Sequence, residues 1–184
     1  MPLPRIACFH GGGSTAPIFA VQCSRLQKQL DADFQLVFFE APFERSAGPG
    51  VLPFFDEKTY GPYKTWFLST DEARQDGSSE EGGEDGVERV LSLMRAQGEG
   101  GNGPLMAGEG QVEKISIPTF HLHGLRDKQL EPGRQQMKTY YDAKTTKLME
   151  IDYHHAMPWN KEDLEGFAGF LREAYASVTT KNET

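Results

Sequence analysis

The apolar run RIACF at residues 5–9, followed by HGGGST at 10–15, decides the fold. An apolar run that stops at three glycines is typical of a buried strand entering a tight loop. Ser14 or Thr15 can then cap a helix. From 16 to 30, apolar residues recur at helical spacing, so we expect one helix with an inward apolar face: Phe19, Cys23, Leu26 and Leu30.

The same alternation continues along the chain. Apolar runs predict three further strands, at 34–39, 115–123 and 147–152. Helical spacing predicts three further helices, at 87–97, 131–142 and 164–175. Strands that alternate with helices favour a mainly parallel sheet with helices on both faces. The sequence therefore predicts a three-layer α/β fold.

The length of 184 residues suits a single domain spanning 1–184. Two stretches interrupt the regular pattern, and we expect them to be irregular or mobile. The first, 43–86, begins rich in aromatic residues and becomes acidic and glycine-rich. The second, 98–112, is rich in glycine and has no period.

Composition excludes several classes of function. The net charge is −8, with 27 acidic and 19 basic residues, so we expect no nucleic-acid partner. No run approaches the roughly 18 apolar residues of a membrane span. The N-terminal sequence has no basic leader followed by a long apolar stretch, so we expect a cytoplasmic protein. Cys8 and Cys23 both lie at apolar positions, which does not indicate a disulfide framework.

An aspartate and a histidine follow the last two predicted strands. Asp127 comes just after 115–123, and the pair His154-His155 comes just after 147–152. In parallel α/β sheets, functional groups collect at the carboxyl ends of the strands. An acid followed by a histidine also matches the chain order of an α/β-hydrolase triad. The structural alternatives are a turn aspartate or helix cap and a surface imidazole.

The glycines at 11–13 offer backbone N–H groups that no side chain covers. Such a loop can stabilise the oxyanion of an acyl-transfer reaction, and Gly12 and Gly13 are the candidates. The alternatives are a tight strand-to-helix turn and the phosphate loop of a flavodoxin-like protein. The run fits neither of the common nucleotide-binding glycine patterns.

We expect no metal and no cofactor. Several histidines and Asp127 are candidate ligands, but their spacing does not match a zinc motif. We expect each of these histidines to be a structural residue whose ring nitrogens are hydrogen-bonded: His10, His121, His123 and His154.

Taken together, these motifs resemble the fungal serine hydrolases of the FSH type. The resemblance rests on HGGGSTAPIFAVQCSRLQ from residue 10, YKTWF at 63–67, IPTFHLHGLRD at 117–127 and HHAMPWN at 154–160. It implies an α/β-hydrolase fold and an esterase or thioesterase activity, including the release of polyketide acyl chains from a synthase. It also implies Asp127 as the triad acid and His155 as the base. His154 stands where the family usually has glycine and is the weaker candidate for the base.

The aromatic residues at 54–67 would line an acyl pocket in this reading, and the alternative is a local core beneath a long loop.

The chain departs from the family at the nucleophile. No serine lies in a G-x-S-x-G context, and the segment between 98 and 114 is too short for the expected elbow and its flanking elements. An internal deletion of two strand–helix units explains the gap and predicts four strands in order 2-1-3-4. Ser14 is a weak substitute, since capping is its expected role. We therefore expect weak or no hydrolysis, and a non-catalytic binding protein is the alternative.

Overall fold

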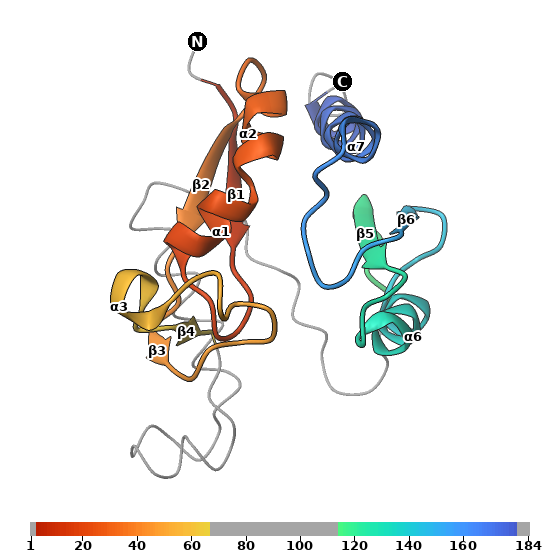
Figure 1. Ribbon diagram of the computed structural model, residues 1–184. Helices are drawn as coiled ribbons and strands as arrows, with labels where there is room; N and C mark the ends of the chain where they lie inside the picture. The colour runs from red at the N-terminus through yellow and green to blue at the C-terminus, as the bar shows by residue number, and fades with distance from the viewer. Residues whose placement is uncertain (1–2, 67–113, 180–184) are drawn as a thin grey trace. The chain divides into compact units, whose positions relative to one another are not determined.

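The computed structural model describes residues 3–66 and 114–179 (Figure 1). The chain divides into two compact units. The N-terminal unit comprises Pro2–Cys23 and Gln35–Pro104, and the C-terminal unit comprises Ser24–Phe34 and Leu105–Thr184. The predicted helix at 87–97 and the irregular stretch at 98–112 lie outside the described residues. The single domain over 1–184 stays a prediction.

The N-terminal unit is built on two parallel strands. β1 (Arg5–Phe9) pairs with β2 (Gln35–Phe39), and Phe9 lies opposite Phe39. Helix α1 (Ala16–Gln22) packs on β2, where Phe19 meets Phe38 edge to face at 5.7 Å between ring centroids. Successive side chains of a strand point to opposite faces, so the ring of Phe39 turns the other way and stacks on Phe9 at 5.1 Å.

The predicted helix at 16–30 is two helices. α1 ends at Gln22. Its C-cap Cys23, with a φ of −85° and a ψ of 0°, separates it from α2 (Ser24–Leu30). Neither glycine nor proline marks the break. The inward face is nevertheless close to the predicted one, with Ile18 buried more deeply than Phe19. The deeply buried residues of this face are Ile18, Cys23, Leu26 and Leu30.

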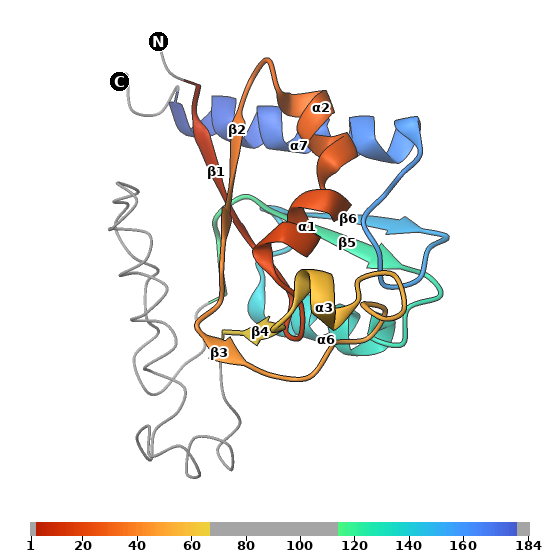
Figure 2. The same cartoon turned by 60° about the vertical axis from the view of Figure 1, so that its left-hand side comes forward.

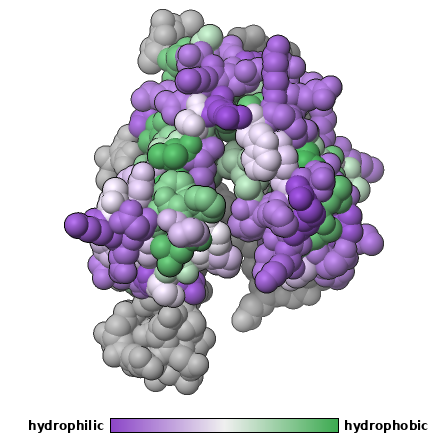
Figure 3. Space-filling model, viewed as in Figure 1, coloured by the Kyte–Doolittle hydropathy of each residue, from purple (hydrophilic) through white to green (hydrophobic). Residues whose placement is uncertain are grey.

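The stretch predicted as irregular, 43–86, is described up to 66, where it is ordered and held together by aromatic residues, and 67–86 lies outside the described residues. It contains the short antiparallel pair β3 (Phe43–Glu44) and β4 (Lys64–Thr65) and the helix α3 (Glu57–Tyr60). Its buried residues form a local core with α1: Ile18, Val51 and Tyr63, flanked by Ala47, Phe55 and Tyr60. Leu52 and Phe54, by contrast, are exposed, the latter at 80%, and apolar surface is visible on this unit in Figure 3. The local core is therefore present, and the acyl pocket stays a prediction.

The C-terminal unit contains a second parallel pair. β5 (Thr119–Gly124) runs beside β6 (Thr146–Ile151), with α6 (Leu130–Tyr140) between them in sequence. β5 starts later than predicted, and Ile115 instead makes an isolated bridge with Tyr141.

The two faces of this strand pair are covered by different helices. Phe120 stacks on Phe167 of α7 (Lys161–Thr179) at 5.1 Å. His123, one of the residues on the opposite face, lies against Gly133 of α6. Figures 1 and 2 show α6 and α7 on opposite sides of the pair. Layers of helix, sheet and helix are therefore present in this unit, as predicted.

Helix α2 packs against α7 within the same unit. The Arg172 guanidinium donates to the Asp33 carboxylate at 2.8 Å and to the Gln29 carbonyl at 2.8 Å. The rings of Phe34 and Tyr175 meet edge to face at 5.4 Å.

The chain thus has the mixed α/β architecture of a reduced α/β-hydrolase-like fold, with parallel strand pairs and covering helices. The described residues form three two-stranded sheets, so the four-strand order 2-1-3-4 is not confirmed and stays a prediction. Among the described helices, none is long and apolar enough to span a bilayer.

Candidate active site

The loops after β5 and β6 are bonded to one another along their backbones. Leu125 N–H donates to Ile151 O at 2.8 Å, and Arg126 N–H donates to Tyr153 O at 3.0 Å. Gly124 permits this approach, because a Cβ there would lie 2.4 Å from His154 O. The loops leave the same edge of the parallel pair, which brings Asp127 and His155 together across 28 positions.

The Asp127 carboxylate is held at both oxygens. Its Oδ2 lies 2.7 Å from His155 Nδ1, and its Oδ1 accepts from Gln129 N–H at 2.9 Å. The Asp127 side chain is 15% exposed, whereas that of His155 is 69% exposed. Since an ionised carboxylate only accepts, Nδ1 carries the shared proton and leaves Nε2 as a base that faces outward. No hydrogen bond to that Nε2 is found among the described residues.

The electrostatics of this pair favour a charged aspartate. Burial raises the pKa of Asp127, but hydrogen bonds from Gln129 N–H and His155 outweigh burial and hold the pKa below its ordinary value. The charge of His123 acts in the same direction. A carboxylate that stays ionised can orient and stabilise an imidazolium.

The neighbouring histidine has a different environment. His154 Nδ1 lies 3.1 Å from Arg126 O and makes no contact with the Asp127 carboxylate. Of the two histidines left open by the sequence, His155 has the geometry of a triad base. The catalytic roles of Asp127, His155 and His154 stay predictions.

The two oxyanion-hole candidates differ in this structure. Gly13 N–H already donates to Lys64 O at 2.8 Å, so it is not free to meet an oxyanion. Gly13 has a φ of +77° and packs its backbone against Gly48, whose N–H donates to Gly13 O at 2.8 Å. Gly12 is exposed, and its N–H has no hydrogen-bond partner in the described part of the chain. Gly12 is therefore the better candidate.

Ser14 does not have the surroundings of a nucleophile. Its Oγ is buried and has no hydrogen-bond partner among the described residues. Capping of α1 falls to Thr15, whose Oγ1 accepts from Ile18 N–H at 3.3 Å, and this corrects the predicted role of Ser14. A buried hydroxyl without a neighbouring base is not activated for attack.

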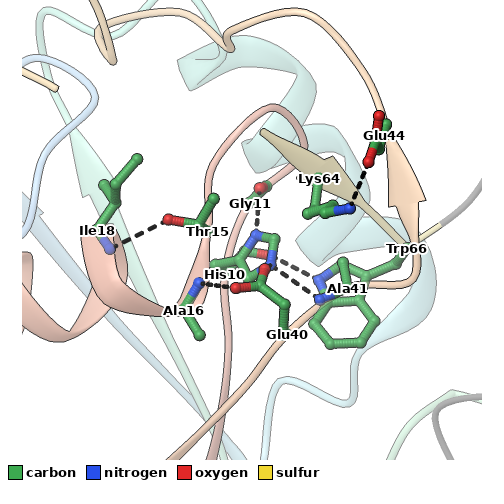
Figure 4. A network of polar contacts seen from close by, with 10 residues as sticks. All are labelled: His10, Gly11, Thr15, Ala16, Ile18, Glu40, Ala41, Glu44, Lys64 and Trp66. Atoms are coloured by element: carbon green, nitrogen blue, oxygen red, sulfur yellow. Dashed lines mark hydrogen bonds and ion pairs between the residues drawn. The ribbon is translucent and has the colours of Figure 1, made fainter. Parts of the chain in front are cut away.

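The histidine before the glycines is itself buried and lies at the centre of a polar network (Figure 4). His10 is 3% exposed. Its Nδ1 lies 2.8 Å from Gly11 O, and its Nε2 lies 3.0 Å from Glu40 Oε1 and 3.1 Å from Ala41 N. Trp66 Nε1–H donates to the His10 carbonyl at 2.7 Å. Glu40 was not singled out from the sequence, although it follows β2 as His10 follows β1.

Neither cysteine offers an activated thiol. Burial, with a smaller contribution from Cys8, raises the pKa of Cys23 to about 12. Cys8 is only partly buried and is hydrogen-bonded to Ile6 O at 3.5 Å. The Cys23 thiol therefore stays neutral, and a neutral thiol is a poor nucleophile.

Two histidines of β5 depart from expectation. His121 Nε2 and His123 Nδ1 are buried without hydrogen-bond partners in the described residues, although we expected the ring nitrogens of these histidines to be hydrogen-bonded. Glu150 Oε1 lies 3.8 Å from His123 Nδ1, but the Arg134 guanidinium already holds this carboxylate at 2.8 Å. Across 3–66 and 114–179, no group of three or more potential ligands converges as a metal site would require.

The sequence also matches known proteins. The family model described as serine hydrolase (FSH1) matches residues 1–105, more than half of the chain. The chain is 28% identical to the probable esterase azaC of Aspergillus niger, over 88% of this chain and 81% of the relative. It is also 28% identical to the esterase FUS5 of Gibberella moniliformis, over 97% of this chain and 90% of the relative.

A third relative bears on the missing elbow. An esterase of Didymella fabae is 27% identical over an alignment of 245 residues that includes 93% of this chain. That alignment is longer than the 184 residues of the chain, so the relative has residues within the aligned region that this chain lacks. The difference agrees with an internal deletion relative to the family. On the family match over 1–105, this chain belongs to the FSH1 serine hydrolase family.

Proposed function

We propose that the Asp127–His155 pair is the acid–base part of an esterase or thioesterase, and that this chain retains it without the serine nucleophile. The contact that supports the proposal is the 2.7 Å approach of His155 Nδ1 to Asp127 Oδ2. The relatives named as esterases favour an acyl ester as substrate. A polyketide acyl thioester on a synthase carrier domain, in the cytoplasm of a fungus, is the finer form of the proposal.

In the proposed reaction, His155 acts directly on water. Its Nε2 takes a proton from water as the water oxygen attacks the carbonyl carbon of the ester. The tetrahedral intermediate then expels the alkoxide or thiolate, which receives the proton from Nε2. Asp127 stabilises the transient imidazolium and keeps its Nδ1 protonated. The predicted oxyanion donor narrows from the pair Gly12 and Gly13 to Gly12, because the Gly13 N–H is already bonded to Lys64 O.

The expected rate is low. Enzymes that lose the triad serine keep on the order of 10³–10⁴ over the reaction in water, from binding and oxyanion stabilisation. Ser14 does not replace the lost residue, because its Oγ is buried and unpartnered among the described residues. We therefore propose slow hydrolysis with no acyl-enzyme intermediate.

A non-catalytic binding protein is the second candidate. The absence of G-x-S-x-G favours it, since covalent catalysis has no visible nucleophile. Such a protein would bind an acyl thioester and release it unchanged. The two candidates therefore differ in turnover.

Hydrolysis of p-nitrophenyl butyrate and of an acyl N-acetylcysteamine thioester separates them. The expected result is a slow reaction that His155→Ala slows further by about 10²-fold, the contribution of a general base, and that His154→Ala retains. Equal rates in the native protein and His155→Ala would exclude His155 as the base. Hydrolysis that never exceeds the buffer rate, together with saturable binding of a non-hydrolysable thioether, would favour the binding protein.

A fluorophosphonate probe tests the covalent route separately. Because no serine stands in a G-x-S-x-G context, intact-mass spectrometry should find the protein unlabelled. Stoichiometric labelling at Ser14 would overturn the proposal of a water-only reaction.

A further inference from the structure

The peptide between Gly11 and Gly12 links the buried network to the exposed glycine. A trans peptide is planar, and its carbonyl and N–H point in opposite directions. The Gly11 carbonyl points inward, where it meets His10 Nδ1 at 2.8 Å and Ser14 N–H at 3.2 Å. The direction of the Gly12 N–H therefore depends on what holds the Gly11 oxygen.

The His10 ring is fixed on several sides. Its side chain has no solvent exposure, and its centroid lies 5.3 Å from that of Trp66. Ala41 N–H approaches Nε2 at 3.1 Å, and the Glu40 carboxylate lies 3.0 Å from the same atom. Glu40 is itself anchored, since its Oε2 accepts from Ala16 N–H at 3.2 Å. Rotation of this ring would break several of these contacts together.

The contact of His10 Nδ1 with a carbonyl oxygen shows that Nδ1 carries a proton. A carbonyl oxygen only accepts hydrogen bonds, so Nδ1 must donate to Gly11 O. In the neutral ring Nε2 then accepts from Ala41 N–H, and in the charged ring it donates to Glu40. Both forms keep the bond from Nδ1 to Gly11.

We propose that His10 is a positioning residue that orients the Gly12 N–H by holding the Gly11 carbonyl. The inference rests on the proposed function, in which Gly12 donates to the oxyanion. The bond at the carbonyl also polarises the peptide and strengthens its N–H as a donor. His10 thus acts through Gly12 and does not touch the substrate.

Two substitutions separate this role from simple core packing. His10→Asn keeps an amide donor near the place of Nδ1, and His10→Gln places its amide near Nε2. Two-dimensional NMR of the Gly12 amide provides the readout. The expected result is a nearly native Gly12 signal in His10→Asn and a displaced signal in His10→Gln. Equal displacement in both variants overturns the positioning role.

The native protein supplies a second measurement that does not depend on folding of a variant. Ring nitrogen shifts of His10 should show Nδ1 protonated throughout the pH range of the folded state. A neutral ring protonated at Nε2 alone would remove the donor to Gly11 and overturn the proposal.

Titration with butylphosphonate, a tetrahedral anion that needs no serine, tests the linked function of Gly12. The Gly12 amide should shift on binding, and His10→Gln should weaken binding about tenfold, the size of one lost hydrogen bond to a charged group. Inorganic phosphate is the control for a non-specific anion. If the two variants differ as expected but butylphosphonate leaves Gly12 unmoved, the oxyanion role fails and the positioning by His10 stands.

Discussion

His155 Nδ1 lies 2.7 Å from Asp127 Oδ2, although the two residues are 28 positions apart in the sequence. The approach follows from the parallel pairing of β5 with β6, whose exit loops are hydrogen-bonded along their backbones. The sheet, rather than either loop alone, therefore sets the distance between carboxylate and imidazole. The Asp127–His155 contact therefore reports whether the C-terminal unit is folded.

Acid stability should depend on Asp127. Its pKa is lowered in the folded protein, so its contribution to stability is present above its ordinary pKa and is lost as pH falls through the lowered one. Asp127→Asn should therefore flatten the decline of the unfolding midpoint below about pH 4. Thermal unfolding between pH 2 and pH 6 measures this.

Asp142→Asn is the matched control for that series. Asp142 accepts from the N–H two residues ahead at 2.9 Å, as Asp127 does, but has no histidine partner. The steep decline should persist in this variant. A profile for Asp127→Asn that matches the native one would show that the pair adds nothing to acid stability.

His121 should make the protein sensitive to pH in a higher range. Burial, with the nearby His123, lowers the pKa of His121. The unfolded chain then binds the proton first, so stability is complete above the ordinary pKa of about 6.5 and decreases as pH falls below it. His121→Phe should reduce the slope of stability between about pH 5 and 7. His154→Phe, at an exposed position, should leave the slope intact.

The glycines of the loop should respond unequally to substitution. A Cβ on Gly13 would lie 2.2 Å from Gly48 N, at a φ of +77°. Gly13→Ala should cost about 3 kcal/mol or more in the free energy of unfolding, since backbone strain and a steric clash add together. Gly11→Ala is the control, because a Cβ there would meet nothing within 4 Å. Urea denaturation measures both, and equal losses would contradict the packing of Gly13 on Gly48.

Cys23 should be protected from thiol reagents in the folded protein. A pKa of about 12 leaves on the order of 10³-fold less thiolate near pH 8 than a free cysteine has. Cys8→Ser isolates Cys23, and its reaction with a disulfide reagent should become fast only after unfolding in urea. Rapid reaction under native conditions would show that the thiol is accessible.

The sequence predicted the elements whose signals are local. Apolar runs marked β1, β2 and β6 to within one or two residues, because the apolar residues that a short strand packs against its neighbours lie close together in the sequence. The break at Cys23 had no such signal, since neither glycine nor proline stands there. The spacing of the apolar residues continues through Cys23, so periodicity could not mark the end of α1.

The candidate site could be predicted only in part for the same reason. Asp127 and His155 each follow a strand, so their meeting could be anticipated from parallel pairing. The sequence could not show which glycine has a free N–H. That depends on Lys64 O, which is distant in the sequence and accepts from the Gly13 N–H but not from the Gly12 N–H. Glu40 was missed because a lone glutamate after a strand has no motif.

The proposed function requires that Asp127 holds His155 as a base with Nδ1 protonated and Nε2 free. Nitrogen-15 NMR of the histidine rings near neutral pH tests it most directly, with Asp127→Asn measured alongside. We predict that the neutral His155 ring carries its proton on Nδ1 in the native protein and loses this preference in Asp127→Asn. A neutral His155 ring protonated on Nε2, or one unchanged by Asp127→Asn, would contradict it.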